Sequence, residues 1–111
     1  MELSHSVEKH VCIVLIEGEL IQSKVEHVKE YVISALIDEQ SKGLILDLKR
    51  VVYVDTAGVA MILVLFRHLK EQEKKMAICQ LPKNLNDPFE VIRFNNLITI
   101  YNTQEQALAS F

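Results

Sequence analysis

The hydrophobic positions change their period along the chain. Residues 11–16, VCIVLI, are apolar at odd and even positions, which is typical of a strand covered on both faces. Residues 17–19, EGE, are expected to end that strand. The apolar positions then step by three and four, as on one stripe of an amphipathic helix: Ile21, Val25, Val28, Val32, Ala35 and Leu36. Gly43, which tolerates a left-handed backbone, is expected to end this helix.

The segment VDTAGVAMILVLF, residues 54–66, ends in eight consecutive apolar residues. It follows a predicted buried strand at 44–48, LILDL, and precedes another at 76–81, MAICQL. No turn signal separates the apolar run from the polar RHLKEQEKK that follows it, so a strand is disfavoured. Five apolar residues of the stretch 57–73 fall on one face at helical spacing: Val59, Ile62, Leu63, Phe66 and Leu69. The pattern therefore predicts a helix over 57–73 with DTAG at its N-terminus.

The last quarter of the chain predicts three short elements. These are a helix around 87–95, a strand near ITIY at 98–101, and a closing helix from Thr103, whose hydroxyl suits a helix start. Buried strands that alternate with amphipathic helices predict an α/β domain with a mostly parallel sheet. The length favours a single domain over residues 1–111.

Composition and charge narrow the class of protein. Hydrophobic residues make up 50% of the chain and charged residues 24%, which is ordinary for a globular domain. The net charge is −3, and the densest lysine stretch, KEQEKK, is interrupted by glutamates, so nucleic-acid binding is not expected. No apolar run approaches the roughly 18 residues of a membrane span. The N-terminus lacks the features of a secretion signal, so we expect a cytoplasmic protein.

Metal, cofactor and enzyme chemistry find little support. Cys12 and Cys79 each lie inside an apolar run, no CxxC pair occurs, and the four histidines are scattered. We expect buried thiols, no metal site and no cofactor. No nucleophile stands near a plausible base in the sequence, which disfavours an enzyme.

The start of the central helix is the candidate site. Asp55 or Thr56 can cap the free N–H groups there, and Gly58 allows close approach of another surface. One interpretation is a capping motif alone. The other is a phosphate switch on Thr56, since the helix dipole tolerates added negative charge. Such a phosphate would expel a partner that meets this surface with carboxylates or a dry apolar face.

The segment LILDLKRVVYVDTAGVAMILVLFRHLK resembles the central part of STAS domains, especially bacterial anti-sigma factor antagonists. VCIVLIEGEL is similar to the early strand and G-x-L turn of that family, and ITIYNTQEQAL to its closing strand and helix. Together these segments cover nearly the whole chain. Ile21 stands where many antagonists have an aspartate after the turn.

The resemblance implies an α/β fold with a mixed, mostly parallel sheet of four to five strands and about four helices, packed mainly on one face. It also implies a regulator without catalytic activity. Thr56 takes the place of the family's serine, which a cognate kinase that doubles as an anti-sigma factor phosphorylates. The unphosphorylated form binds that kinase, and a phosphatase restores it. The matching motif residues are expected to form the partner-binding surface: Asp55, Thr56, Ala57, Gly58 and Val59.

Two alternatives remain. The same fold could serve as an accessory or scaffold subunit, of a lipid transporter or a stressosome, that acts without phosphorylation. A phosphoaspartate receiver domain is the other, with Glu17 and Glu19 as an acidic pair and Lys83 as its late lysine.

Overall fold

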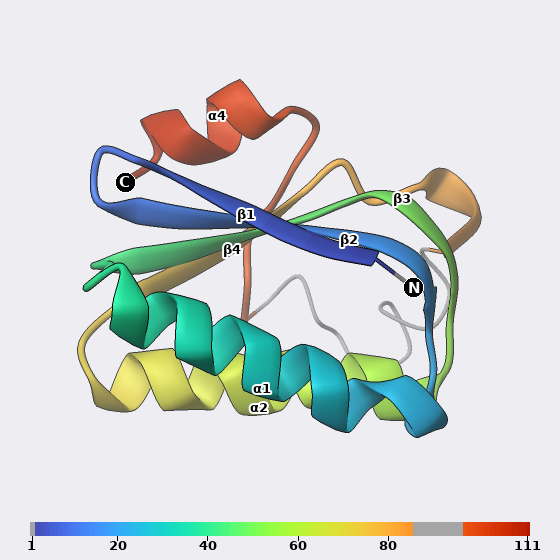
Figure 1. Ribbon diagram of the computed structural model, residues 1–111. Coiled ribbons are helices and arrows are strands. Elements are labelled where there is room, and N and C mark those ends of the chain that lie inside the picture. Colours follow the sequence, from blue (N-terminus) through green and yellow to red (C-terminus); the bar gives the residue numbers. More distant parts are fainter. Residues whose placement is uncertain (1, 86–96) are drawn as a thin grey trace.

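Five strands form one sheet in the computed structural model, which describes residues 2–85 and 97–111 (Figure 1). The first strand runs antiparallel to the second, and all later neighbours are parallel. In sheet order the strands are β1 (Glu2–Glu8), β2 (Val11–Leu20), β3 (Gly43–Val54), β4 (Lys75–Cys79) and β5 (Ile100–Tyr101). The expected mixed, mostly parallel sheet is confirmed.

Two long helices cover one face of the sheet, α1 (Gln22–Asp38) and α2 (Thr56–Glu71), and the short α4 (Gln104–Ala109) lies on the other (Figure 1). A 3-10 turn, η1, spans Lys83–Leu85. The three α-helices of the described residues match predicted ones. Thr103 caps α4 as expected, because its hydroxyl accepts a hydrogen bond from the Gln106 N–H at 3.0 Å. The helix predicted around 87–95 lies outside the described residues.

The sheet separates two hydrophobic clusters, which explains the continuous apolar run of β2. Even-numbered members such as Cys12 and Val14 belong to the large core under α1 and α2. Odd-numbered members, Val11 and Ile13, pack with Ala107 of α4 in the smaller cluster on the opposite face. Residues 11–14 of β2 are therefore buried on both faces, as the sequence pattern predicted.

Two predicted strand boundaries are wrong because backbone pairing continues beyond the apolar residues. β2 runs through EGE to Leu20, since Glu17 and Glu19 still pair with Arg50 and Tyr53 of β3 across two register irregularities. β3 likewise continues from LILDL through KRVVYV to Val54. β1 was not predicted: its sequence ELSHSVE is polar, and all but one of its residues are exposed.

The predicted role of Gly43 as the end of α1 is also wrong. The helix ends at Asp38, and the residue with a left-handed backbone is Gln40, with φ of 51°. Gly43 opens β3, where a Cβ atom would overlap the ring of Phe111. Gly43 therefore lies close to the Phe111 ring and does not form the turn that ends the helix.

Both cysteines are buried and unpaired, as expected. Burial raises the pKa of the Cys79 thiol from 9.0 to about 12, with a smaller contribution from the neighbouring Asp47 carboxylate. Below pH 9 the thiol is protonated in folded and unfolded chains alike. Between about 9.0 and 12 only the unfolded chain releases this proton, so the free energy of unfolding falls as pH rises.

We expect this thiol to contribute a loss of up to about 1.4 kcal/mol per pH unit in that window. Urea unfolding of the wild type and of Cys79→Ala across the alkaline range measures it. The replacement should lower stability at neutral pH, and its stability should fall less steeply than that of the wild type above pH 9. Identical slopes for the two proteins would contradict the prediction.

Candidate functional site

Asp55 is the N-cap of α2. Its backbone is extended, with φ of −97° and ψ of −178°, and its Oδ1 accepts a hydrogen bond from the Gly58 N–H at 2.8 Å. The sequence left open whether Asp55 or Thr56 caps the helix. The structure shows that the carboxylate does so, and Thr56 is the first helical residue.

The same carboxylate also caps α1. Asp55 Oδ2 accepts a hydrogen bond from the backbone N–H of Gln22 at 3.0 Å, where α1 begins. Ile21, the N-cap residue of α1, makes no side-chain cap of its own. One carboxylate thus satisfies donors at two helix N-termini, whose positive ends meet at this point. No local pattern reveals a bond between Gln22 and Asp55, which lie 33 residues apart in sequence.

Thr56 presents its side chain to solvent at this junction. Its hydroxyl has no hydrogen-bond partner among the residues that the structure describes. The position combines an accessible oxygen with the electropositive end of α2. The Thr56 side chain is therefore accessible from solvent and makes no buried contact.

The five residues expected to bind a partner divide by burial. Thr56 is exposed, and Asp55 and Ala57 are partly exposed. Gly58 and Val59 are buried and pack inward, Val59 in the main core and Gly58 against Leu20 and Val54. Gly58 and Val59 therefore lie beneath the candidate site, whereas Asp55, Thr56 and Ala57 reach its surface.

A groove of about 400 Å³ lies between α1 and α2, and Ala57, the residue after Thr56, is one of those that line it. Its apolar lining comes from both helices: Val25, Ala57, Ala60, Met61 and Val64. The Glu26–Lys29 ion pair, at 3.1 Å, also lines it. Outside the groove, Val52 and Tyr53 at the end of β3 are exposed apolar side chains, at 66% and 52%. Sequence reasoning missed the groove because two separate helices form it.

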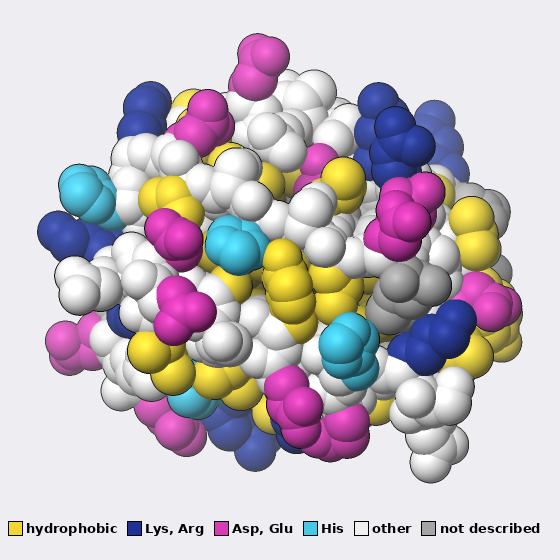
Figure 2. Space-filling view, viewed as in Figure 1, with side chains coloured by type: hydrophobic (Ala, Val, Ile, Leu, Met, Phe, Trp, Pro, Cys, Tyr) yellow, Lys and Arg dark blue, Asp and Glu magenta, His cyan; other side chains and the backbone are white. Residues whose placement is uncertain are grey.

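Metal chemistry and a membrane span find no support in the described part of the chain. Acidic and basic side chains are interspersed over the face seen in Figure 2. Over residues 2–85 and 97–111, no group of three histidines, cysteines or carboxylates is placed to hold a metal ion. None of the described helices is both long enough and apolar enough to cross a membrane.

Comparison with known proteins identifies the family. The sequence model of the STAS domain family matches residues 3–107 of this chain. The chain therefore belongs to the STAS domain family, as its resemblance indicated. Membership of this family excludes the alternative that the chain is a phosphoaspartate receiver domain.

Relatives of the chain carry the name of anti-sigma factor antagonist. A putative anti-sigma factor antagonist, BtrV of Bordetella bronchiseptica, is 27% identical over 79 residues, which cover 71% of this chain and 68% of BtrV. The anti-sigma F factor antagonist of Paenibacillus polymyxa is 24% identical over 110 residues, covering 97% and 94% of the two chains.

Among solved structures, the anti-sigma factor antagonist SpoIIAA shares the fold. Its unphosphorylated form has a TM-score of 0.80 at 17% identity and covers 96% of this chain and 93% of its own. The phosphorylated form of Bacillus SpoIIAA has a TM-score of 0.74 at 17% identity, with 98% of both chains covered.

Proposed function

We propose that this protein is an anti-sigma factor antagonist controlled by phosphorylation of Thr56. The unphosphorylated chain binds a cognate anti-sigma factor that is also a serine/threonine kinase. Phosphorylation of Thr56 abolishes the complex, and a phosphatase restores it. The chain itself is a regulator without catalytic activity, and this role is carried out in the cytoplasm.

The accessible hydroxyl of Thr56 at the N-terminus of α2 carries the proposal. The names of the relatives support the antagonist role, and SpoIIAA, a protein of the same fold, exists in unphosphorylated and phosphorylated forms. The apolar groove between α1 and α2 supplies a surface on which a partner can bury its own apolar side chains.

Electrostatics explains why one phosphate would suffice. It adds about 1.5 to 2 negative charges at pH 7 at a point that a bound partner must dehydrate. A desolvated and unpaired charge costs several kcal/mol, whereas the free protein keeps its phosphate in water. Phosphorylation therefore acts on the complex far more than on the fold.

We expect Thr56→Glu to weaken binding to the partner kinase at least about tenfold, or about 1.4 kcal/mol. Calorimetric titration with the kinase measures the effect. Thr56→Gln, of similar size but neutral, is the matched control and should bind much more tightly than the glutamate variant. Thermal unfolding should remain near that of the wild type for both.

If Thr56→Glu binds as tightly as the wild type, the switch is excluded. That outcome would favour the alternative of an accessory or scaffold subunit, in which the same helix junction serves as a permanent docking surface.

A further inference from the structure

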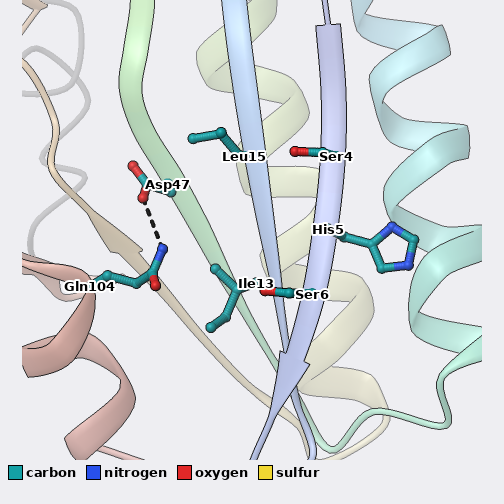
Figure 3. A pocket seen from close by; sticks show the side chains of 7 residues that line it. All are labelled: Ser4, His5, Ser6, Ile13, Leu15, Asp47 and Gln104. Carbon is teal, nitrogen blue, oxygen red and sulfur yellow. Dashed lines mark hydrogen bonds between the residues drawn. The ribbon is translucent and has the colours of Figure 1, made fainter.

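The sheet face that carries α4 is only partly covered. Ala107 and Leu108 of α4 pack over one part of it, and beside them lies an open pocket of about 210 Å³. Figure 3 shows Asp47 and Gln104 on one side of this pocket, Ser4 and Ser6 on the other, and Ile13 and Leu15 between them. The ring of His5 turns away, toward α1, where its Nδ1 lies 2.8 Å from the Tyr31 hydroxyl.

Strand register brings these groups together. Ser4 of β1 pairs with Leu15 of β2, and Leu15 pairs with Asp47 of β3. The three residues thus form one row across neighbouring strands, on the same face of the sheet. The row places an acid at one end, a hydroxyl at the other and an apolar side chain between.

Asp47 is a buried carboxylate whose hydrogen-bond partners are all neutral. It is 3% exposed, and its Oδ2 accepts from the side-chain amides of Gln80 at 2.8 Å and Gln104 at 3.0 Å. Its Oδ1 accepts from the backbone N–H of Lys49 at 3.0 Å. Over the described part of the chain, no lysine, arginine or histidine nitrogen forms an ion pair with it.

These three neutral donors leave one acceptor position of the carboxylate free, on Oδ1, and leave its charge uncompensated. A buried charge is usually paired with an opposite one because desolvation is costly. The Asp47 carboxylate raises the pKa of the buried Cys79 thiol next to it, after the larger effect of burial, as an uncompensated negative charge should. The pocket that this carboxylate lines is therefore electronegative.

We propose that this pocket binds a guanidinium or primary ammonium group on an aliphatic stem. The cationic head would pair with Asp47, and the stem would lie along Ile13 and Leu15 toward Ser4 and Ser6 at the other side of the pocket. The pocket suits an arginine or lysine side chain of a bound protein, or a small free alkylguanidine or alkylamine. It lies on the face of the sheet opposite α1 and α2 and is independent of the role of Thr56.

Nuclear magnetic resonance titrations of the full chain test this proposal with two probes. N-acetyl-argininamide represents a peptide-borne side chain and agmatine a free alkylguanidine. Saturable shifts are expected at the amides of Ser4, Ser6 and Gln104. The controls are N-acetyl-citrullinamide, which is neutral and nearly isosteric, and tetramethylammonium, which has a charge but no N–H donor; neither should shift these signals.

The outcomes separate the sources of the ligand. Shifts with both guanidinium probes support a protein-borne side chain, and shifts with agmatine alone support a free alkylguanidine. No saturable shift with either probe, or equal shifts with a control, overturns the proposal.

Two substitutions test whether the ligand binds at Asp47. Asp47→Asn should weaken probe binding at least about tenfold, since the charge-assisted bonds are lost. If this variant fails to fold, Leu15→Arg provides a tethered cation in the neighbouring position of the cross-strand row. It should unfold at a higher temperature than Leu15→Gln and no longer bind the probes. An unfolding temperature equal to or below that of the glutamine variant would contradict the site.

Discussion

Replacing Gly58 with alanine should destabilise the protein by about 2–3 kcal/mol, the upper part of the range for overpacked sites. A Cβ atom on Gly58 would overlap the carbonyl oxygen of Leu20 and lie 2.9 Å from a methyl carbon of Val54. The Leu20 carbonyl also accepts the Asp55 N–H at 3.2 Å, so any displacement of β2 disturbs the helix cap. Urea unfolding monitored by circular dichroism measures the loss.

Whether Gly58→Ala destabilises or stabilises the protein shows whether the close contact with Leu20 exists. Inside a helix, glycine is ordinarily up to about 1 kcal/mol less favourable than alanine, so without the close contact Gly58→Ala would stabilise. Ala60→Gly, on the exposed side of the same helix, is the matched control and should cost about 1 kcal/mol through propensity alone. A Gly58→Ala protein as stable as the wild type would show that α2 does not pack against Leu20 as described.

Removing the shared cap is the second large effect. Asp55→Ala should cost about 2 kcal/mol or more, because a single cap contributes roughly 1 kcal/mol and this carboxylate serves two helix N-termini. The Gln22 and Gly58 N–H groups would both lose their acceptor. Chemical unfolding of the variant measures the total, and amide hydrogen exchange in the first turns of α1 and α2 shows where protection is lost.

Asp55→Asn should separate the contribution of the cap on α2 from that of the cap on α1. An asparagine has one acceptor oxygen, so it can keep the bond from Gly58 but then offers an amide donor toward Gln22. Its stability should fall between those of the wild type and of Asp55→Ala, with faster exchange mainly at the start of α1. If Asp55→Ala loses less than about 0.5 kcal/mol, the two-helix cap is not a real feature of the protein.

The hydrophobic pattern predicted the order of the elements because buried strands and helices carry a recognisable spacing of apolar residues in the sequence. The strand 11–16 and the helix from 57 are examples, and both lie where the pattern placed them. β1 has no such apolar pattern because it is polar and exposed at the edge of the sheet. The ends of β2 and β3 depend on pairing between their backbones, which side-chain hydrophobicity does not report.

The start of α2 was located from sequence, but the contacts that Asp55 makes there were not. The motif around Asp55 and Thr56 marked the start of α2, and the family resemblance indicated its role. The bond from Gln22 to Asp55 and the groove between the helices arise only when α1 and α2 lie side by side. The absence of an acid at position 21 is understandable in this light, since Asp55 supplies the cap that Ile21 cannot.

The most direct test of the proposed switch is the intact mass of the protein isolated from its native cells, before and after phosphatase treatment. We predict a fraction heavier by one phosphate, removed by phosphatase, mapped to Thr56 by fragmentation and absent from complexes with the kinase. A chain that carries no phosphate at Thr56 under any growth condition, or one that stays bound to its partner while phosphorylated there, would contradict the account.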